Sequence, residues 1–222
     1  MADWVRDPSL SARHLDIPAN TPVYEPGSPA RNLYFIHSGQ VRVYQIGPNG
    51  AARLVEILGP GEWFGAASLS SLGSHFTRAI AVSRSGIAEV PVDRLLPLLA
   101  AQPDVASELI VQLAGKLQAA HDDAARLVFD DCEDRLIKTL LHFSHTAAAS
   151  PHQGGEVVLR ITHQALAQAV GAARETVSLT LTRLRQQNLL RTGRNRLFFN
   201  PQVLQAVERK RGGVRPSEQV AM

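Results

Sequence analysis

The chain has 222 residues, 45% of them hydrophobic and 19% charged, which is enough to bury a substantial core in one large domain or two small ones. No run approaches the roughly 18 uninterrupted apolar residues of a membrane-spanning helix, and the N-terminus has no apolar segment behind a basic start, so a cytoplasmic protein with no membrane partner is expected. The single cysteine, Cys132, excludes a disulfide or a cysteine-based metal cluster within one chain.

Charge is distributed unevenly along the chain. Residues 1–150 hold 12 Lys and Arg against 16 Asp and Glu, whereas residues 151–222 hold 11 against 4. Arginine supplies ten of the eleven positive charges in the second segment, and its planar fork suits phosphate oxygens and guanine edges. A basic surface also serves solubility alone, but the C-terminal segment is the part expected to meet a polyanion.

Residues 18–92 are predicted to form short antiparallel β-strands. Glycines interrupt the segment, and between them lie alternating or β-branched runs: LYFIH, VRVYQI, RLVEIL and FTRAIAV. No helical pattern among them is long enough for a parallel βαβ sheet. The N-terminal domain, residues 1–103, is therefore expected to be a β-roll or jelly roll within an α+β fold.

From Asp104 to about Phe129 the apolar pattern becomes helical. After Ala106, apolar residues recur at spacings that alternate between three and four and form a predicted seam: Ile110, Leu113, Leu117, Ala120, Ala124 and Leu127. This heptad pattern predicts that residues 104–130 form a central helix that pairs with a second chain as a coiled coil. The alternative is that the stripe packs on the protein's own barrel, but its narrowness favours pairing between chains.

The next segment, FDDCEDRLIKTLLHF, predicts a hinge and a new helix. Asp130 and Glu133 have the spacing of a capping box, so the helix is expected to begin near Asp131. A Ser/Ala/Gly/Pro-rich loop and the short strand VVLRIT follow. The last stretch, RKRGGVRPSEQVAM, lacks apolar periodicity and is expected to be mobile. Residues 131–222 are taken as the C-terminal domain.

The segment ITHQALAQAVGAARETVSLTLTRLRQQNLL has the spacing of a helix-turn-helix. Thr162 can cap a helix over residues 163–170, in which Ala167 is a small residue where two helices touch. Gly171 suits the sharp turn, and Val177 suits the contact that locks the second helix. The predicted shared core consists of Leu166, Val170, Val177, Leu181 and Leu184.

The second helix, expected to begin around Ala173 or Arg174, is predicted to enter the major groove of DNA. Its expected base contacts are Arg174, Glu175, Ser178 and Leu179. Arginine donates two hydrogen bonds to guanine, and glutamate accepts one from cytosine. The alternative for the Arg-Glu pair is a solvated helix start, with the glutamate favoured by the helix dipole. The surrounding spacing favours DNA reading.

The segment QQNLLRTGRNRLFFN predicts a β-hairpin whose turn is TGRN. A basic hairpin beside a recognition helix is a winged arrangement, and its arginines suit phosphates. The expected phosphate contacts come from the hairpin and from the starts of both helices: Thr162, Gln164, Thr176, Arg191, Arg194 and Arg196.

Taken together, these motifs resemble the CRP/FNR (catabolite activator/fumarate-nitrate regulator) family. Besides the helix-turn-helix, GSPARNLYFIHSGQVRVY and LGPGEWFG are similar to that family's β-roll, and the heptad helix is similar to its dimerisation helix. The resemblance covers about residues 18–205. It implies a homodimeric transcription regulator, expected to be an activator, that binds double-stranded DNA and contacts RNA polymerase.

One departure from the family concerns cyclic AMP. The cassette that holds the nucleotide in cyclic-AMP-binding members begins with Gly-Glu and ends with Arg-Ser-Ala or Arg-Thr-Ala, where this chain has GAASLSSLGSHFTRAI. Ala66 replaces the glutamate, and aligning Ala79 with the final alanine puts Thr77, not Arg78, at the arginine position. Weak or no cyclic-AMP dependence is therefore predicted. If another small ligand controls the protein, the expected pocket is Phe64, Gly65, Ala66, Ala67 and Arg78.

A second departure lies in the recognition helix. Family members that read TGTGA-type half-sites carry another arginine five residues after the first, where this chain has Leu179. Leucine cannot donate to guanine but can contact a thymine methyl group. The palindromic operator is therefore expected to be related to TGTGA and altered at one base pair.

Other sensing chemistries are weaker interpretations. Cys132 near the hinge is a candidate redox switch, although a lone thiol is more often inert packing. His142 and His145 form an HxxH pair that suits a metal, although surface or core histidines are the simpler interpretation.

Three more histidines are candidate haem ligands: His14, His37 and His75. Some members of the family bind 2-oxoglutarate through arginines, but Arg78 and Arg126 are a poor match for those residues. No cofactor or metal is predicted.

An enzyme is the alternative from another class of protein. The sequence contains no nucleophile elbow, P-loop, dinucleotide fingerprint or HExxH zinc motif. The serines of GAASLSS have no evident base partner. The protein is therefore predicted not to be an enzyme.

Overall fold

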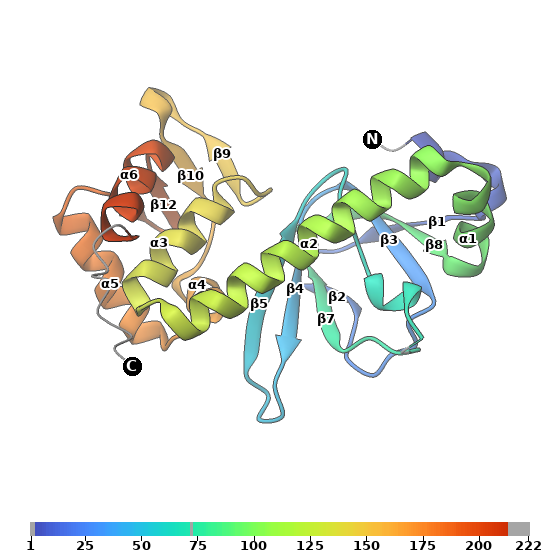
Figure 1. The fold of residues 1–222 in the computed structure, drawn as a ribbon, viewed down its shortest axis with the longest axis horizontal. Coiled ribbons are helices and arrows are strands. Elements are labelled where there is room, and N and C mark those ends of the chain that lie inside the picture. Colours follow the sequence, from blue (N-terminus) through green and yellow to red (C-terminus); the bar gives the residue numbers. More distant parts are fainter. Residues whose placement is uncertain (1–2, 72, 213–222) are drawn as a thin grey trace, which may run out of the picture. The chain divides into compact units, whose positions relative to one another are not determined.

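The structure, a computed structural model, describes residues 3–71 and 73–212. The chain divides into two compact units, Met1–Ala125 and Arg126–Met222. Antiparallel sheets and a long helix give the α+β architecture that the sequence predicts (Figure 1). The finer division into domains at residues 103 and 130 stays a prediction.

Two four-stranded antiparallel sheets form the N-terminal unit, in the orders β1-β8-β3-β6 and β2-β7-β4-β5. The predicted strand-rich segment is confirmed, but its first strand begins before residue 18. The strands are β1 (Arg13–Ile17), β2 (Thr21–Tyr24), β3 (Asn32–Ser38), β4 (Val41–Ile46), β5 (Ala52–Leu58), β6 (Trp63–Phe64), β7 (Thr77–Ala81) and β8 (Ser85–Pro91).

Strand β3 is buried on both faces because its sheet lies between two apolar clusters. Tyr34 and Ile36 belong to the inner cluster, between the two sheets. Leu33 and Phe35 belong to the outer cluster, which the helices of this unit cover. Side chains alternate between the faces of a strand, so a strand covered on both sides is hydrophobic throughout.

Helices α1 (Val92–Ala101) and α2 (Pro103–Phe129) follow the last strand of the roll. The long α2 was predicted from the heptad pattern, whereas α1 was not, because it is short and contains Pro97. Short 3-10 helices lie at Asp3–Arg6, Pro8–Leu10 and Ala66–Leu69. Among the described residues, no helix is both long and apolar enough to cross a membrane.

Helix α2 divides its apolar residues between two faces. Val105 and Leu109 are buried in the outer cluster of the roll, and Leu113 packs partly against it. The other predicted seam residues are exposed, with exposed fractions of 64% for Ile110 and 58% for Leu117. Packing on the protein's own roll therefore accounts for one face of the helix and leaves most of the predicted seam uncovered.

The C-terminal unit contains helices, four short strands and a brief 3-10 turn at Gln153–Gly155. Its sheet has the order β11-β12-β10-β9. The helices are α3 (Cys132–Phe143), α4 (His163–Val170), α5 (Arg174–Gln186) and α6 (Pro201–Gly212). The strands are β9 (Ala149–Pro151), β10 (Val157–Leu159), β11 (Arg191–Gly193) and β12 (Arg196–Phe199).

Two predictions for this unit need correction. The cap of α3 is Asp131, whose carboxylate accepts from the backbone N–H of Asp134 at 2.8 Å, whereas Asp130 pairs with Lys138 at 2.7 Å. Residues 209–212, expected to be mobile, form the last turn of α6. The rest of that predicted mobile tail, residues 213–222, lies outside the described residues.

Candidate nucleic-acid interface

Helices α4 and α5 form a helix-turn-helix with the predicted cap and turn. The Thr162 hydroxyl accepts from the backbone N–H of Ala165 at 3.1 Å and caps α4. Gly171 ends that helix with φ of +69°, a left-handed conformation that favours glycine. A Cβ atom at Gly171 would lie 3.2 Å from Cδ2 of Leu127, so a larger residue there would also require the Leu127 side chain to shift.

The two helices share the core predicted for them. All five of its residues are at most 1% exposed: Leu166, Val170, Val177, Leu181 and Leu184. Arg135 of α3 ties the end of α4 to the segment before α3. Its guanidinium donates to the carbonyl of Val170 at 3.0 Å and to that of Asp130 at 2.8 Å. A cation at the last carbonyl of α4 is favoured by the helix dipole.

The first turns of α5 expose four of the five predicted DNA contacts that lie on this helix. Arg174, Glu175 and Thr176 are exposed, and Leu179 has an exposed fraction of 64%. Ser178 differs from them, since it is half-buried and its hydroxyl lies 3.0 Å from Nδ1 of His163. Sequence reasoning overlooked His163 because no spacing rule connects a residue at the start of one helix with the second turn of the next.

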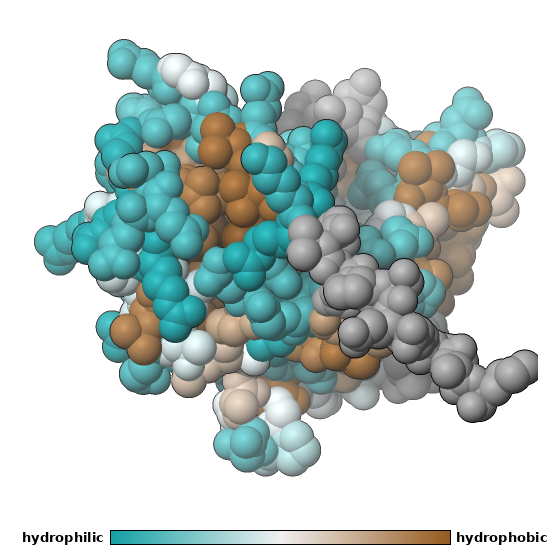
Figure 2. Space-filling view, turned by 60° about the vertical axis from the view of Figure 1, so that its left-hand side comes forward, coloured by the Kyte–Doolittle hydropathy of each residue, from teal (hydrophilic) through white to brown (hydrophobic). Residues whose placement is uncertain are grey.

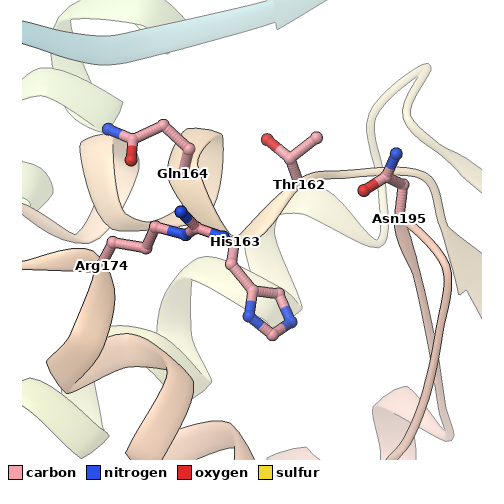
Figure 3. Close-up of a pocket in the computed structure, with 5 residues that line it drawn as sticks. All are labelled: Thr162, His163, Gln164, Arg174 and Asn195. Carbon is pink, nitrogen blue, oxygen red and sulfur yellow. The ribbon is translucent and has the colours of Figure 1, made fainter.

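A pocket of about 440 Å³ lies where the first turn of α4, the start of α5 and the hairpin meet (Figure 3). Its lining residues are Thr162, His163, Gln164, Arg174 and Asn195. In Figure 3, Asn195 lies across the pocket from Arg174. Arg174, expected to read bases, thus lies beside two of the residues expected to contact phosphates, Thr162 and Gln164.

The predicted basic hairpin is formed by β11 and β12, with Gly193 opposite Arg196. Arg194 and Arg196 are exposed. Arg191 is already paired with Glu156, and its guanidinium lies 5.1 Å from the centre of the Phe198 ring. The face shown in Figure 2, where the left-hand side of Figure 1 is turned forward, is mostly hydrophilic.

The residues expected to form an effector pocket do not gather around one space. Phe64 is buried in the inner cluster of the roll, whereas Ala66 packs against the outer cluster, on the other side of the sheet. Gly65, with φ of +90°, lies between them, and Ala67 is half-buried in the 3-10 helix. Arg78 forms an ion pair with Glu25 at 2.6 Å.

Alternation along β7 places Thr77, not Arg78, on the side of the buried Ala79. The Thr77 hydroxyl lies 3.4 Å from that of Tyr24. Burial, with this contact partly opposing it, raises the pKa of Tyr24 to about 12. The interior of the roll at this strand therefore holds a neutral phenol and a threonine rather than an arginine.

Aromatic rings fill the inner cluster next to β7. The ring of His75 stacks on that of Tyr24 with centroids 3.7 Å apart, and the rings of Tyr34 and Phe64 stack at 5.1 Å. His75 is 2% exposed, and both of its ring nitrogens are buried without a hydrogen-bond partner among the described residues. Burial lowers the pKa of His75, so this ring is neutral near pH 7.

The remaining candidate sensing residues form no metal-binding cluster among the described residues. No group of three or more His, Cys, Asp or Glu residues in the described part of the chain is arranged to hold a metal ion. Cys132 has a free, half-exposed thiol at the start of α3. His14 and His37 lie close together in the roll, with ring centroids 5.3 Å apart.

Comparison with protein families and curated proteins agrees with this architecture. Residues 14–102 match the cyclic nucleotide-binding domain, and residues 134–207 match the Crp-like helix-turn-helix domain. The CRP-like cAMP-activated global transcriptional regulator of Mycobacterium tuberculosis is 32% identical over 171 residues, 75% of each chain. The cAMP-activated global transcriptional regulator CRP of Haemophilus influenzae is 32% identical over 190 residues, 85% of this chain and 84% of that one.

Solved structures give the same result. The c-di-GMP responsive global regulator CLP of Xanthomonas campestris has a TM-score of 0.77 and 27% identity, covering 90% of this chain and 99% of that one. FixK2 of Bradyrhizobium japonicum has a TM-score of 0.75 and 25% identity, covering 88% and 96%. Fold and helix-turn-helix thus define a DNA-binding transcription regulator. The chain belongs to the CRP/FNR family.

Proposed function

We propose that the protein is a homodimeric activator that reads a palindromic DNA site related to TGTGA and contacts RNA polymerase. The observation that carries this proposal is the exposed Arg174–Glu175 pair, placed at the start of α5 by a capped helix and a glycine turn. In such a motif, the N-terminal turn of the second helix contacts base edges.

Each predicted contact has a distinct chemistry. Arg174 would donate to guanine O6 and N7, Glu175 would accept from cytosine N4, and Leu179 would contact a thymine methyl group. Ser178 is the least available of the predicted base contacts, because His163 engages its hydroxyl. The predicted phosphate contacts are Thr162, Gln164, Thr176, Arg191, Arg194 and Arg196. Arg191 would first have to leave Glu156.

Dimerisation would use the uncovered face of α2. Two recognition helices read successive major grooves when they lie about 34 Å apart, so the two C-terminal units need a fixed separation. The exposed seam residues Ile110 and Leu117 supply an apolar surface on which a second copy of α2 can pack. Leu113 contributes less, because it packs partly on its own roll.

We further propose that DNA binding does not require cyclic AMP. Arg78 is paired with Glu25, Ala66 offers no hydrogen bond to a ribose, and the Tyr24–His75 stack fills the roll beside β7. The cyclic-AMP-activated relatives and the c-di-GMP responsive regulator make ligand control the alternative function, through a small molecule bound in the roll.

Selection of binding sites from random duplex DNA tests both proposals. The purified protein would be selected alone, with cyclic AMP and with cyclic di-GMP, and the double variant Arg174→Ala, Glu175→Ala is the control. We expect the same TGTGA-related palindrome in all three selections and none with the double variant. A palindrome that emerges only with a nucleotide supports ligand control. The absence of any enriched site overturns the proposal of sequence-specific binding.

A further inference from the structure

The junction between α2 and α3, where the sequence predicts a hinge, is held by hydrogen bonds on several sides. The backbone N–H of Asp130 donates to the carbonyl of Arg126 at 3.1 Å, which closes the last turn of α2. The Asp130 carbonyl accepts from Arg135 at 2.8 Å, and its carboxylate, only 6% exposed, accepts from Lys138 at 2.7 Å. Both backbone groups and the side chain of Asp130 are therefore engaged.

Arg135 extends these contacts to the helix-turn-helix. Its Nε donates to the carbonyl of Val170 at 3.0 Å, while its Nη1 donates to the carbonyl of Asp130. Val170 is the last residue of α4, and Asp130 directly follows the last residue of α2. One guanidinium thus lies between the C-terminal ends of two helices, and the dipole of each helix favours a cation there.

An apolar contact joins the same two elements. A Cβ atom at Gly171, in the turn after α4, would lie 3.2 Å from Cδ2 of Leu127 in the last turn of α2. The C-terminal unit begins at Arg126, so it includes this last turn of α2 (Figure 1). The end of α2 and the DNA-binding motif therefore belong to one compact unit.

The shape of the arginine side chain makes this link directional. A guanidinium is a planar fork whose N–H groups point in fixed directions, so two bonds from one guanidinium constrain the two carbonyls relative to each other. Because these carbonyls stand at the ends of α2 and α4, the bonds constrain how α4 is oriented at the end of α2. Helix α5 shares a buried core with α4 and takes the same orientation.

We propose that Arg135 is a positioning residue for DNA recognition, which fixes the helix-turn-helix on the end of α2 and so sets the half-site spacing that the dimer accepts. The inference rests on the proposed function, in which two copies pair through the exposed seam of α2. Recognition helices about 34 Å apart reach successive major grooves, and one added base pair moves a half-site by about 3.4 Å and turns it by about 35°. A fixed orientation tolerates little of this change.

The test uses the selected operator and versions of it with the half-sites one or two base pairs closer together or farther apart. We expect full-length wild type to bind one spacing roughly tenfold more tightly than its neighbours, because twisting DNA to fit costs energy. Arg135→Gln should reduce this preference to roughly threefold or less, because a loosened motif adapts in place of the DNA. Its base preference within each half-site should not change, since the base contacts on α5 are intact.

Two further variants separate positioning from charge. Arg135→Lys keeps a cation at the helix ends but lacks the planar fork, so it should fold and should also lose spacing preference. Arg209→Gln removes an exposed arginine from the same unit and should keep the wild-type preference. Thermal unfolding gives the temperature at which all the variants are folded. A smaller folded fraction lowers binding at every spacing by the same factor, so it cannot imitate a change in spacing preference.

Salt dependence separates positioning from a direct contact with DNA. Arg135→Gln should keep the wild-type salt slope, because the guanidinium binds carbonyls of its own chain. A slope smaller by about one per half-site would mean that Arg135 contacts a phosphate, and it would overturn the positioning role.

The outcomes distinguish this proposal from the function on which it rests. Folded Arg135→Gln and Arg135→Lys proteins with the spacing preference of wild type overturn the role of Arg135 while DNA recognition stands. Wild type that binds all spacings equally has the same meaning. Wild type that selects no palindromic site overturns the proposed function itself.

Discussion

His75 and Tyr24 stack face to face inside the β-roll, with ring centroids 3.7 Å apart and ring planes 8° apart. The stack lies on the side of β7 that Thr77 occupies, and the Tyr24 hydroxyl lies 3.4 Å from that of Thr77. Because both nitrogens of His75 are buried without partners among the described residues, the ring contributes packing and no hydrogen bond. An apolar ring of similar shape would serve the same purpose.

His75→Phe is therefore expected to stabilise the roll by about 1 kcal/mol, because it removes buried polar atoms that lack partners. The pH dependence should change as well. The folded-state pKa of His75 is lowered by burial, so the unfolded chain binds a proton first as pH falls below about 6.5, and stability is lost in that direction.

Thermal unfolding at several pH values measures both effects. The variant should lose less stability than wild type on acidification, and His145→Gln, at an exposed histidine, should behave like wild type. A variant that is less stable than wild type at neutral pH would mean that the imidazole makes an interaction that phenylalanine cannot replace.

Leu117→Glu should disrupt the proposed dimer, because it places a charge in the middle of the exposed seam of α2. We expect a folded monomer in sedimentation experiments, with operator affinity greatly reduced because one half-site is engaged at a time. Ala119→Glu, on the same helix but outside the seam, is the matched control and should remain dimeric. Dimers of Leu117→Glu that bind DNA like wild type would exclude the seam as the interface.

Gly171→Ala is expected to cost about 1–2 kcal/mol of stability in the C-terminal unit. The new Cβ atom meets two obstacles, a φ of +69° and Cδ2 of Leu127 at 3.2 Å. Gly154→Ala is a suitable comparison, because its φ of +68° is nearly the same while nothing lies within 4 Å of its added Cβ atom. The free energies of unfolding of both variants, measured with denaturant, differ by the contribution of the Leu127 contact. Equal losses of stability would show that the backbone conformation alone favours glycine at residue 171.

Leu179→Arg should add a guanine preference to each half-site, because the side chain is 64% exposed on the recognition face and arginine can donate to guanine O6 and N7. We expect discrimination at one symmetric pair of positions to change by roughly 1–3 kcal/mol per half-site. Binding-site selection with the variant and with wild type measures it. Identical base preferences would mean that residue 179 does not face the bases.

The helix-turn-helix was predictable from sequence because its determinants are local: a cap, a glycine turn and apolar residues at helical spacing. The β-roll was predictable for a similar reason, since strand alternation and glycine turns leave a periodic pattern. The contact between His163 and Ser178 was not predictable, because it depends on how two helices cross. The expected effector pocket grouped Phe64 with Ala66, but these residues pack in two different apolar clusters, on opposite sides of the sheet. The sequence did not reveal this difference, because no periodic pattern shows that a 3-10 helix begins at Ala66.

The last turn of α6 has a consequence for anyone who shortens this protein. Arg211 donates at 2.6 Å to Asp134 and at 2.6 Å to Glu133, and lies 3.6 Å from Asp131, so one guanidinium joins the chain's final described helix to the first turn of α3. A truncation for crystallisation that ends before Arg211 would remove a shared counter-charge from three neighbouring carboxylates, of which Glu133 would keep Arg183 at 3.9 Å. Fragments should therefore extend through residue 212.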